Sequence, residues 1–370
     1  MKKKVIQFIS ALGDGGAETL VKDYACMLDR DLFDVTIVCI YQLTGTANSK
    51  RIIDNDIKTF YIYKNHKLTT RIFRTIFGEL YIPLKLKRYF KKERPDIIHV
   101  HLAHLKYIYR IRSCLKGVKV FYTCHSLAKR MFSGKNAIEK KAALNLIENN
   151  NLKLIALHKQ MADELNSLFS IDNTVIIKNG VDFNKFREVN QTKEDLRVQY
   201  NIPERSLLLG NIGRFVPSKN QMLLLDILNE LKRREVDSQL MIIGSGELEA
   251  ELRERVHKYS LDENVFFFSH RTDIPQLLKC MDVFVFPSLY EGLSVTLVEA
   301  QVSGLKCVIS DKINPESILS ESTIVVPLDS PVDVWVEKIL DASCRNHIHN
   351  DINQFDLRKE IKKLEDLYLG

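Results

Sequence analysis

The sequence lacks several features that would assign it to a special class of protein. Its seven cysteines are scattered and form no C-x-x-C pair, which argues against a disulfide framework or a zinc site and favours buried, reduced thiols. No apolar run reaches the roughly 20 residues that a membrane-spanning helix needs. The apolar run 5–10 follows three lysines but ends in a glycine-rich turn, so we interpret it as a first β-strand and not as a signal peptide. These features predict a cytoplasmic protein.

Charge is distributed unevenly along the 370 residues. Residues 1–180 hold 31 Lys and Arg against 16 Asp and Glu, whereas residues 181–370 hold 23 against 31. The chain is too long for one ordinary core, and halves of opposite sign indicate two domains with different partners. A basic half suits nucleic acid, anionic lipid or a phosphorylated substrate, and the sign alone does not choose among them.

Apolar runs alternate with helix-length amphipathic segments along most of the chain. Strands are predicted in two series, at 5–9, 35–40, 97–100, 118–123 and 152–156, and then at 207–212, 240–243, 265–268, 283–287 and 307–310. Continuously apolar strands separated by helices indicate parallel sheets covered on both faces. We therefore expect an α/β protein with two doubly wound, Rossmann-like domains, 1–182 and 183–350. A last helix within 351–370 should bury Leu357, Ile361, Leu364 and Tyr368 on one face.

Open parallel sheets bind ligands at the carboxyl ends of their strands, so we looked for chemistry there. A glycine-rich turn containing Gly16 follows the first strand and opens a helix, whose free N–H groups suit an anion; a tight turn without a ligand is an equal alternative. Arg214 and Lys219 follow the first strand of the second series. Two cations beside a helix N-terminus suit a diphosphate, although a solvated loop with incidental charges is the alternative.

The segment 286–300 combines a loop, two carboxylates and the start of an apolar helix. Glu291 stands in the loop, and Glu299 lies eight positions on, inside the predicted helix. A carboxylate there needs a hydrogen-bonding partner, and a ribose diol would serve. Glu291 could meet sugar hydroxyls while the N–H groups of Gly292, Leu293 and Ser294 meet phosphate; a surface Glu and an ion-paired helix Glu are the alternative reading.

Histidines lie in or shortly after two predicted strands of the first half. His125 follows the predicted strand 118–123 and could bind a substrate or move a proton. His99, His101 and His104 are spaced loosely like metal ligands, but no carboxylate or cysteine completes a site. Packing or crevice lining is the favoured role for those three.

Residues 71–92 mix cations with aromatic and aliphatic side chains and contain a single Glu79. Such a mixture suggests a helix that lies in an anionic membrane interface, and Pro83 would bend or split it. A helix packed on its own sheet with a solvated basic face is the alternative.

At these residues the sequence resembles glycosyltransferase family 4, the retaining GT-B enzymes that include many capsule and exopolysaccharide transferases. The resemblance covers nearly the whole chain. It is carried by the turn 15–18, the segments 179–182, 213–220 and 243–247, and above all the block 287–299 with its two glutamates.

The resemblance implies a GT-B fold, a UDP-sugar or other NDP-sugar donor held mainly by the second domain, an acceptor bound by the first, no metal and no other cofactor. It also implies a last helix that packs back on the first domain. Glu291 would hold donor sugar hydroxyls, Glu299 the ribose diol, and Arg214 with Lys219 the diphosphate. Gly16 would approach the phosphate or the acceptor, and His125 would contact the donor sugar. Gly244 and Arg271 complete the expected donor site, although Ser269 and His270 depart from the family's usual glycine before the arginine.

We therefore predict a retaining transferase that extends a lipid-linked oligosaccharide for capsule, exopolysaccharide or another cell-surface glycan, peripheral on the inner face of the membrane through residues 71–92. One alternative is a soluble GT-B enzyme, transferase or epimerase, acting on a small molecule. Another is a nucleic-acid-binding protein that uses the basic half; we expect no nucleic acid partner, because the basic stretch matches no nucleic-acid motif.

Overall fold

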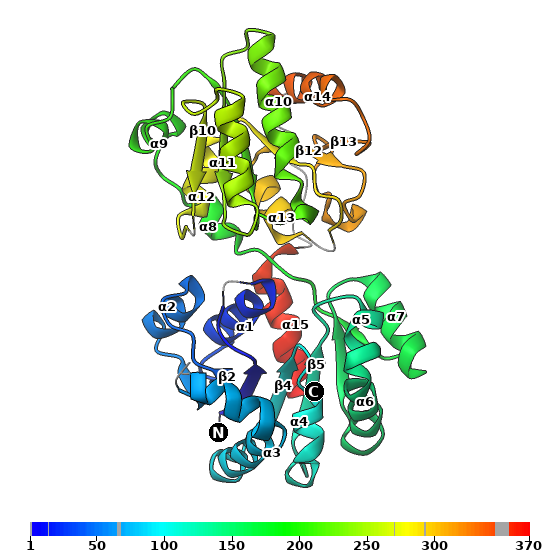
Figure 1. Ribbon diagram of the computed structural model, residues 1–370. Helices are drawn as coiled ribbons and strands as arrows, with labels where there is room; N and C mark the ends of the chain where they lie inside the picture. The colour runs from blue at the N-terminus through cyan, green and yellow to red at the C-terminus, as the bar shows by residue number, and fades with distance from the viewer. Residues whose placement is uncertain (1, 14, 65–67, 270, 292–293, 345–354) are drawn as a thin grey trace. The chain divides into compact units, whose positions relative to one another are not determined.

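The chain forms two compact units. The structure, a computed structural model, describes residues 2–13, 15–64, 68–269, 271–291, 294–344 and 355–370, with the backbone alone at 68–77 and 187. The first unit contains residues 1–179 and 358–370, and the second contains residues 180–357 (Figure 1). The predicted boundary at 182/183 lies close to this division.

The first unit is built on a seven-stranded parallel sheet with the order β3-β2-β1-β4-β5-β6-β7. Its strands are β1 Lys3–Ile9, β2 Phe33–Tyr41, β3 Lys58–Tyr63, β4 Ile97–His101, β5 Lys119–Thr123, β6 Lys153–Ala156 and β7 Val175–Ile176. Its helices are α1 Gly16–Met27, α2 Ala47–Asp54, α3 Leu68–Glu93, α4 Leu105–Arg110, α5 Ala128–Phe132, α6 Ala137–Asn150, α7 Lys159–Phe169 and α15 Leu357–Leu369. The sheet order reverses between β1 and β4, which makes their carboxyl ends a topological switch point.

The second unit repeats this plan with a six-stranded parallel sheet in the order β10-β9-β8-β11-β12-β13. Its strands are β8 Leu207–Ile212, β9 Ser238–Ile243, β10 Val265–Phe268, β11 Val283–Phe286, β12 Lys306–Ser310 and β13 Ile324–Val326. Its helices are α8 Phe183–Arg187, α9 Lys193–Gln199, α10 Gln221–Arg233, α11 Glu249–Lys258, α12 Ile274–Cys280, α13 Val295–Val302 and α14 Val332–Cys344. Here the order reverses between β8 and β11.

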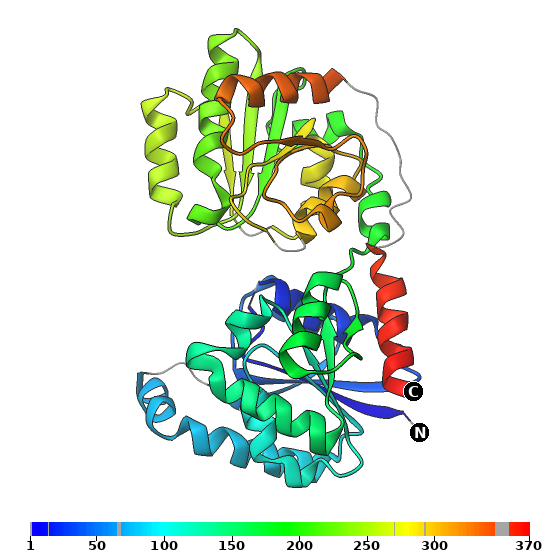
Figure 2. The same ribbon diagram turned by 90° about the vertical axis from the view of Figure 1, so that its right-hand side faces the viewer.

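Strand alternation divides the core of the second unit into two layers. Val283 and Val285 pack in the cluster that contains α10, α11 and α14, while Phe284 and Phe286 pack in the cluster that contains α9, α12 and α13. Successive residues of a strand point to opposite faces, so a wholly apolar strand buries side chains on both. Figure 2 shows helices on either side of this sheet.

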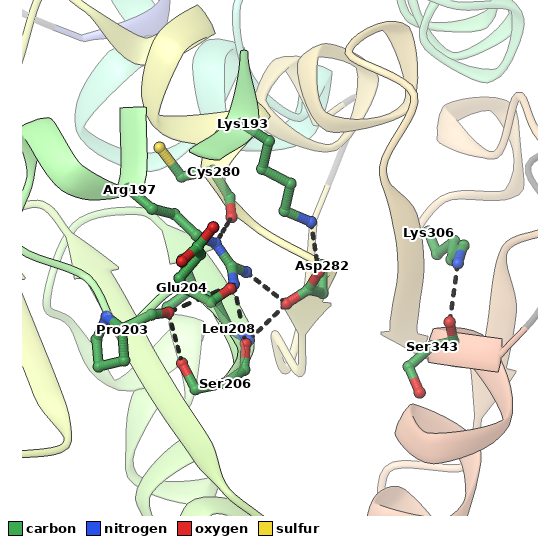
Figure 3. A network of polar contacts seen from close by, with 10 residues as sticks. All are labelled: Lys193, Arg197, Pro203, Glu204, Ser206, Leu208, Cys280, Asp282, Lys306 and Ser343. Atoms are coloured by element: carbon green, nitrogen blue, oxygen red, sulfur yellow. Dashed lines mark hydrogen bonds and ion pairs between the residues drawn. The ribbon is translucent and has the colours of Figure 1, made fainter. Parts of the chain in front are cut away.

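A buried arginine fixes helix α9 to the amino ends of two strands (Figure 3). The Arg197 side chain is 4% exposed and donates to the carbonyl oxygens of Cys280, Glu204 and Ser206. It also lies 2.7 Å from Asp282 Oδ2, which accepts from the Leu208 amide. The neighbouring cations hold the pKa of Asp282 below its usual range, helped by that amide. This network lies at the end of the sheet opposite to the switch point.

Helix α3 runs through Pro83 as one helix, so of the two predicted effects, a bend or a split, the split does not occur. A proline leaves the carbonyl four residues earlier without its helical donor, and here that carbonyl belongs to Glu79. The Arg110 guanidinium donates to it, and a second nitrogen of Arg110 lies 3.2 Å from the Glu79 carboxylate. Helix α4 thus supplies the missing hydrogen bond.

The four residues of the predicted face of helix α15, Leu357, Ile361, Leu364 and Tyr368, are all buried. Ile361, Leu364 and Tyr368 belong to the first unit, and Leu357 is the last residue of the second. The Tyr368 ring lies 5.1 Å from the ring of Phe121 in β5. Lys119 Nζ, 3.0 Å from the carbonyl oxygens of Tyr368 and Leu369, caps the helix end. In the described part of the chain, no helix is long and apolar enough to span a bilayer.

Candidate active site

Two loops meet at the switch point of the second unit, one after β8 and one after β11. The Leu289 amide donates to the Ser218 carbonyl at 2.8 Å, and Asn220 Nδ2 donates to the Pro287 carbonyl at 3.2 Å. Because β8 and β11 are adjacent parallel strands, their following loops leave the sheet side by side. The predicted segments 213–220 and 286–291 therefore form one site.

The centre of this site is an ion pair between Lys219 Nζ and Glu291 Oε1. Their side chains are only 19% and 15% exposed, and Lys219 Nζ lies 5.2 Å from the centroid of the Phe286 ring. A shielded pair of this kind is weak evidence for stability. Chemically, it places a cation suited to phosphate beside a carboxylate that accepts hydrogen bonds from hydroxyl groups.

Two further predicted residues lie on the same loops and the following helix. Arg214 is exposed at the start of the loop after β8, where its own carbonyl accepts from Gln221 Nε2 at 2.9 Å. Glu299 is half-buried in helix α13. Both are thus carried by the two elements that follow the switch-point strands.

Gly244 has a structural reason to be glycine. Its φ is +151°, and a Cβ atom there would lie 2.0 Å from the Gly213 carbonyl oxygen. Gly246 is similar, because its Cβ would lie 2.3 Å from the Phe215 carbonyl oxygen. The loop after β9 thus packs directly against the loop after β8. This close packing explains the glycines at 244 and 246 without a ligand.

The start of helix α13 differs from the prediction at Ser294. This residue is buried, its hydroxyl caps the helix by accepting from the Leu297 amide, and its own amide donates to Ser317 Oγ at 3.1 Å. The amide predicted to meet phosphate is therefore engaged. Gly292 and Leu293 lie outside the described residues. At the other loop, Asn220 directly precedes helix α10.

Arg271 lies in a compact cluster near the sheet edge, after β10. Its Nε donates to Asp273 Oδ1 at 2.8 Å, and its guanidinium lies 5.6 Å from the Tyr200 ring centroid. The Tyr200 hydroxyl also donates to Asp273, at 2.7 Å. The hydrogen bond to Asp273 raises the pKa of Arg271. The Tyr200–Asp273 bond joins the end of α9 to the start of α12. No contact among the described residues joins it to the Lys219–Glu291 pair.

The first unit places two predicted residues at the carboxyl ends of its strands. Gly16 is the exposed first residue of α1, and a Cβ added there would meet nothing within 4 Å. His125 follows β5 and is half-buried, with Nε2 2.9 Å from Nδ1 of His101. Burial lowers the pKa of His125 to about 4, so its imidazole is neutral at pH 7.

His99 and His101 of β4 are packed side chains, in agreement with packing as one of the two predicted roles. His99 and His101 are fully buried and stack with ring centroids 4.4 Å apart. Within the described residues, no group of three or more His, Cys, Asp and Glu side chains is placed to hold a metal ion.

The sequence analysis missed three contributors to the site. Phe286 supplies the ring beside Lys219, Asn220 joins the two loops, and Ser317 engages the start of α13. Only Asn220 carried a signal, because an Asn before an apolar helical run is a capping candidate. The roles of Phe286 and Ser317 could not be predicted, because tertiary packing decides which residues lie beside them.

Comparison with known proteins gives the same picture over nearly the whole chain. The family model described as Glycosyltransferase Family 4 matches residues 14–185, and the one described as Glycosyl transferases group 1 matches residues 192–352. The UDP-Gal:alpha-D-GlcNAc-diphosphoundecaprenol alpha-1,3-galactosyltransferase of Escherichia coli is 27% identical, over 93% of this chain and 90% of that protein. The capsular polysaccharide biosynthesis glycosyltransferase CapH of Staphylococcus aureus is 23% identical, over 99% of both.

A solved structure confirms the fold. The chain matches Anabaena HepE in complex with UDP with a TM-score of 0.72 and 17% identity, over 99% of both chains. At this identity the match concerns the fold alone, and it agrees with the two doubly wound units described above. The chain therefore belongs to glycosyltransferase family 4 and is a glycosyltransferase of the GT-B fold.

Proposed function

We propose that this enzyme transfers a sugar from a UDP-sugar to a lipid-linked oligosaccharide, with retention of anomeric configuration, in the synthesis of capsule, exopolysaccharide or another cell-surface glycan. The observation that carries the proposal is the Lys219–Glu291 pair between the two loops at the switch point of the second unit. The name of the Escherichia coli relative states that its donor is a UDP-sugar and that its acceptor is linked to diphosphoundecaprenol. HepE, which has the same fold, binds UDP.

In the proposed mechanism, cationic side chains stabilise the charge that develops on the departing diphosphate. Lys219 and Arg214 supply this charge, so transfer needs no metal ion and no other cofactor. Glu291 accepts hydrogen bonds from donor sugar hydroxyls while Lys219 fixes its orientation. Glu299 binds the ribose diol, and His125 contacts the donor sugar.

The other residues predicted to contact the donor are not assigned to donor binding. Gly244 and Arg271 have the structural roles described above, and the Ser294 amide already has a partner. We therefore assign donor binding to Arg214, Lys219, Glu291 and Glu299.

The decisive experiment is a thermal-shift and calorimetric titration of the full chain with UDP, GDP, ADP and common UDP-sugars, with EDTA present. A ligand that binds only the folded state raises its stability by mass action. We expect UDP to raise Tm, and a UDP-sugar to bind Glu291→Gln at least tenfold more weakly than it binds the wild type.

A matched control is Glu263→Gln, which changes an exposed carboxylate before β10, at the other end of the same sheet. This control should bind like the wild type. If well-folded protein shows no shift with any nucleotide, the donor-site assignment is wrong. If the shift requires a divalent cation, the metal-free mechanism is wrong.

Helix α3 gives the membrane proposal a defined face. The side chains of 71–77 lie outside the described part of this segment. Ile82, Leu86 and Phe90 are buried, so these three apolar side chains pack inward. The outward face carries Leu80 and Leu84, which are 73% and 48% exposed. It also carries four exposed cations, Lys87, Arg88, Lys91 and Lys92. We propose that this face rests on anionic lipid, with each cation contributing about 1 kcal/mol near the surface.

Sedimentation with vesicles tests the membrane proposal. The protein should pellet with phosphatidylglycerol-containing vesicles at low salt and remain in solution with phosphatidylcholine vesicles. Lys87→Glu with Lys91→Glu should abolish pelleting, whereas Lys116→Glu, an exposed lysine before β5, should not. Equal pelleting of all three proteins would contradict this face.

A further inference from the structure

A chain of buried polar side chains crosses the first unit and ends at His125. Gln7 of β1, His99 and His101 of β4, and Tyr368 of α15 are each at most 1% exposed. Gln7 and His99 are paired in the register of β1 and β4. Polar groups this deep in a core are costly unless each finds a hydrogen-bonding partner.

Each link of this chain is a hydrogen bond. Tyr368 Oη lies 2.6 Å from His99 Nδ1 and accepts from Gln7 Nε2 at 3.0 Å. Gln7 Oε1 lies 2.8 Å from His101 Nε2, and His101 Nδ1 lies 2.9 Å from His125 Nε2. The links join residues up to 361 positions apart in the sequence.

The amide of Gln7 sets the direction of these bonds. Its carbonyl oxygen can only accept, so His101 Nε2 carries a proton and donates to it. Burial and the neighbouring histidines lower the pKa of His101 well below its usual range, so the ring is neutral and its Nδ1 carries a lone pair. Nε2 of His125 must then donate to that lone pair. Because the His125 ring is also neutral, its remaining nitrogen, Nδ1, is a hydrogen-bond acceptor.

We propose that Gln7 and His101 are positioning residues that hold His125 as the neutral tautomer protonated on Nε2, with the Nδ1 lone pair presented to a substrate hydroxyl. Tyr368 acts with them, because its hydroxyl accepts from Gln7 Nε2 and thereby fixes which end of the amide faces His101. Among the described residues, no hydrogen bond joins His125 Nδ1 to another group.

This assignment selects the kind of ligand group that His125 meets, and in that respect it rests on the proposed function. A lone pair attracts a hydroxyl donor and repels a phosphate oxygen, which is itself an acceptor. His125 therefore recognises the sugar moiety of the donor and not its diphosphate. Removing the preference for one tautomer should weaken UDP-sugar binding and leave UDP binding unchanged.

The tautomer can be measured directly on the full chain without any substrate. Two-bond ¹H–¹⁵N correlation spectra of histidine-labelled protein distinguish protonated from unprotonated ring nitrogens, and His125→Gln assigns the signals of interest. In the wild type we expect His125 to be protonated on Nε2 alone. In Gln7→Met, which keeps the side-chain length but removes the acceptor, we expect a mixture of both tautomers.

Two more variants keep this test decisive. Tyr368→Phe retains the ring and removes only the hydroxyl, so it should also yield mixed tautomers even if Gln7→Met does not fold. Tyr24→Phe is the matched control: the Tyr24 ring lies 5.8 Å from His99 and 6.3 Å from His101, but its buried hydroxyl makes no hydrogen bond with the described residues. It should leave the tautomers unchanged.

The outcomes separate the positioning role from the proposed function. A wild-type His125 protonated on Nδ1, or a tautomer that stays the same in folded Gln7→Met and Tyr368→Phe, would overturn the positioning role even if UDP-sugars bind. The expected tautomers without any nucleotide binding would support the positioning role and reject the proposed function. A drop in UDP-sugar affinity in Tyr368→Phe that matches the measured loss of the Nε2-protonated tautomer (about twofold for an equal mixture), with UDP affinity unchanged, would support both.

Discussion

At the scale of single residues, the first prediction concerns Lys219 of the Lys219–Glu291 pair. Lys219→Met should lower kcat by about 100-fold, because it removes a cation that stabilises leaving-group charge in the transition state. Lys312→Met is the matched control, since Lys312 pairs with Asp311 on the surface, where its side chain is 52% exposed. Steady-state kinetics of both variants is the measurement, and equal rates for the two would contradict the role of Lys219.

Substitutions at two glycines test a packing role and a ligand-binding role separately. Gly244→Ala places a methyl group against backbone at a positive φ and should lower the free energy of unfolding by about 2 to 4 kcal/mol. Gly16→Ala meets open space and should change it by less than about 0.5 kcal/mol. If a ligand approaches Gly16 as the family resemblance implies, kcat/KM of Gly16→Ala should still fall at least tenfold.

Urea unfolding and kinetics on the same preparations check the glycine prediction. A Gly16→Ala variant with full activity would remove Gly16 from the site, and a Gly244→Ala variant as stable as the wild type would contradict the close contact with Gly213.

The candidate site was predictable where a rule about position applied. Strand ends and glycine-rich turns indicated Lys219, Glu291 and His125 before any contact was known. The rule could not say that Ser294 already has a partner, or that Gly244 is needed for packing. Those facts depend on which neighbour lies within 3 or 4 Å, and Ser317 and Gly213 are far from them along the chain.

At the scale of helices and strands, the ten predicted strands are all present, and three further strands among the described residues were missed. The missed strands are β3, β7 and β13, and each lies at the edge of its sheet. Edge strands are half-covered and short, so β7 and β13 offer only two and three residues of pattern. Their existence is decided by pairing with a neighbour, which a propensity rule does not see.

The hydrogen bond between helices α3 and α4 leads to a prediction about how Pro83 is tolerated. Pro83→Ala restores the amide that can donate to the Glu79 carbonyl, so the Arg110 bond to that carbonyl becomes dispensable. Arg110→Met should therefore cost about 1 to 2 kcal/mol in the wild type and at least 0.5 kcal/mol less in the Pro83→Ala background, a coupling of the size expected for neighbours.

A double-mutant cycle by urea unfolding measures this coupling. The matched control mutates Arg112 instead of Arg110. The Arg112 guanidinium donates to the carbonyl of Tyr109 and not to Glu79. Arg112→Met should show no coupling to Pro83→Ala. Additive effects of Arg110→Met and Pro83→Ala would mean that the proline is tolerated for another reason.

At the scale of the whole molecule, the buried histidines make stability depend on pH. Burial lowers the pKa of His99 to about 3 and that of His104 to about 4, and His101 and His125 shift in the same direction. Unfolded histidine titrates near 6.5, so between about pH 6.5 and 4 the unfolded chain binds more protons than the folded chain. The free energy of unfolding therefore falls as pH falls, by up to about 1.4 kcal/mol per pH unit for each histidine.

One buried carboxyl opposes this trend. Burial raises the pKa of Glu139 to about 7, so its folded form takes up a proton before its unfolded form does and gains stability as pH falls. Four histidines outweigh one carboxyl. We expect the urea midpoint of the first unit to be clearly lower at pH 5 than at pH 7.5.

His104→Phe isolates one of these histidines. Both ring nitrogens of His104 are buried without a hydrogen bond to the described residues, and the ring lies 5.5 Å from that of Phe8. The variant should unfold at a similar urea concentration at pH 7.5 and lose less stability than the wild type at pH 5. An unchanged pH dependence would show that His104 is not neutral in the folded state.

The first unit is assembled from two stretches of chain that are synthesised far apart in time. As the polypeptide leaves the ribosome, residues 1–179 appear first and the whole of residues 180–357 next; only then does the segment 358–370 arrive. Tyr368, and with it the hydrogen bond that fixes the Gln7 amide, therefore enters the core of the first unit only after the whole second unit has been synthesised. Translation that stops short of this helix would yield a protein with its donor-site loops in place but His125 unaligned. The alignment of His125 thus depends on a segment that is synthesised after the whole of the second unit.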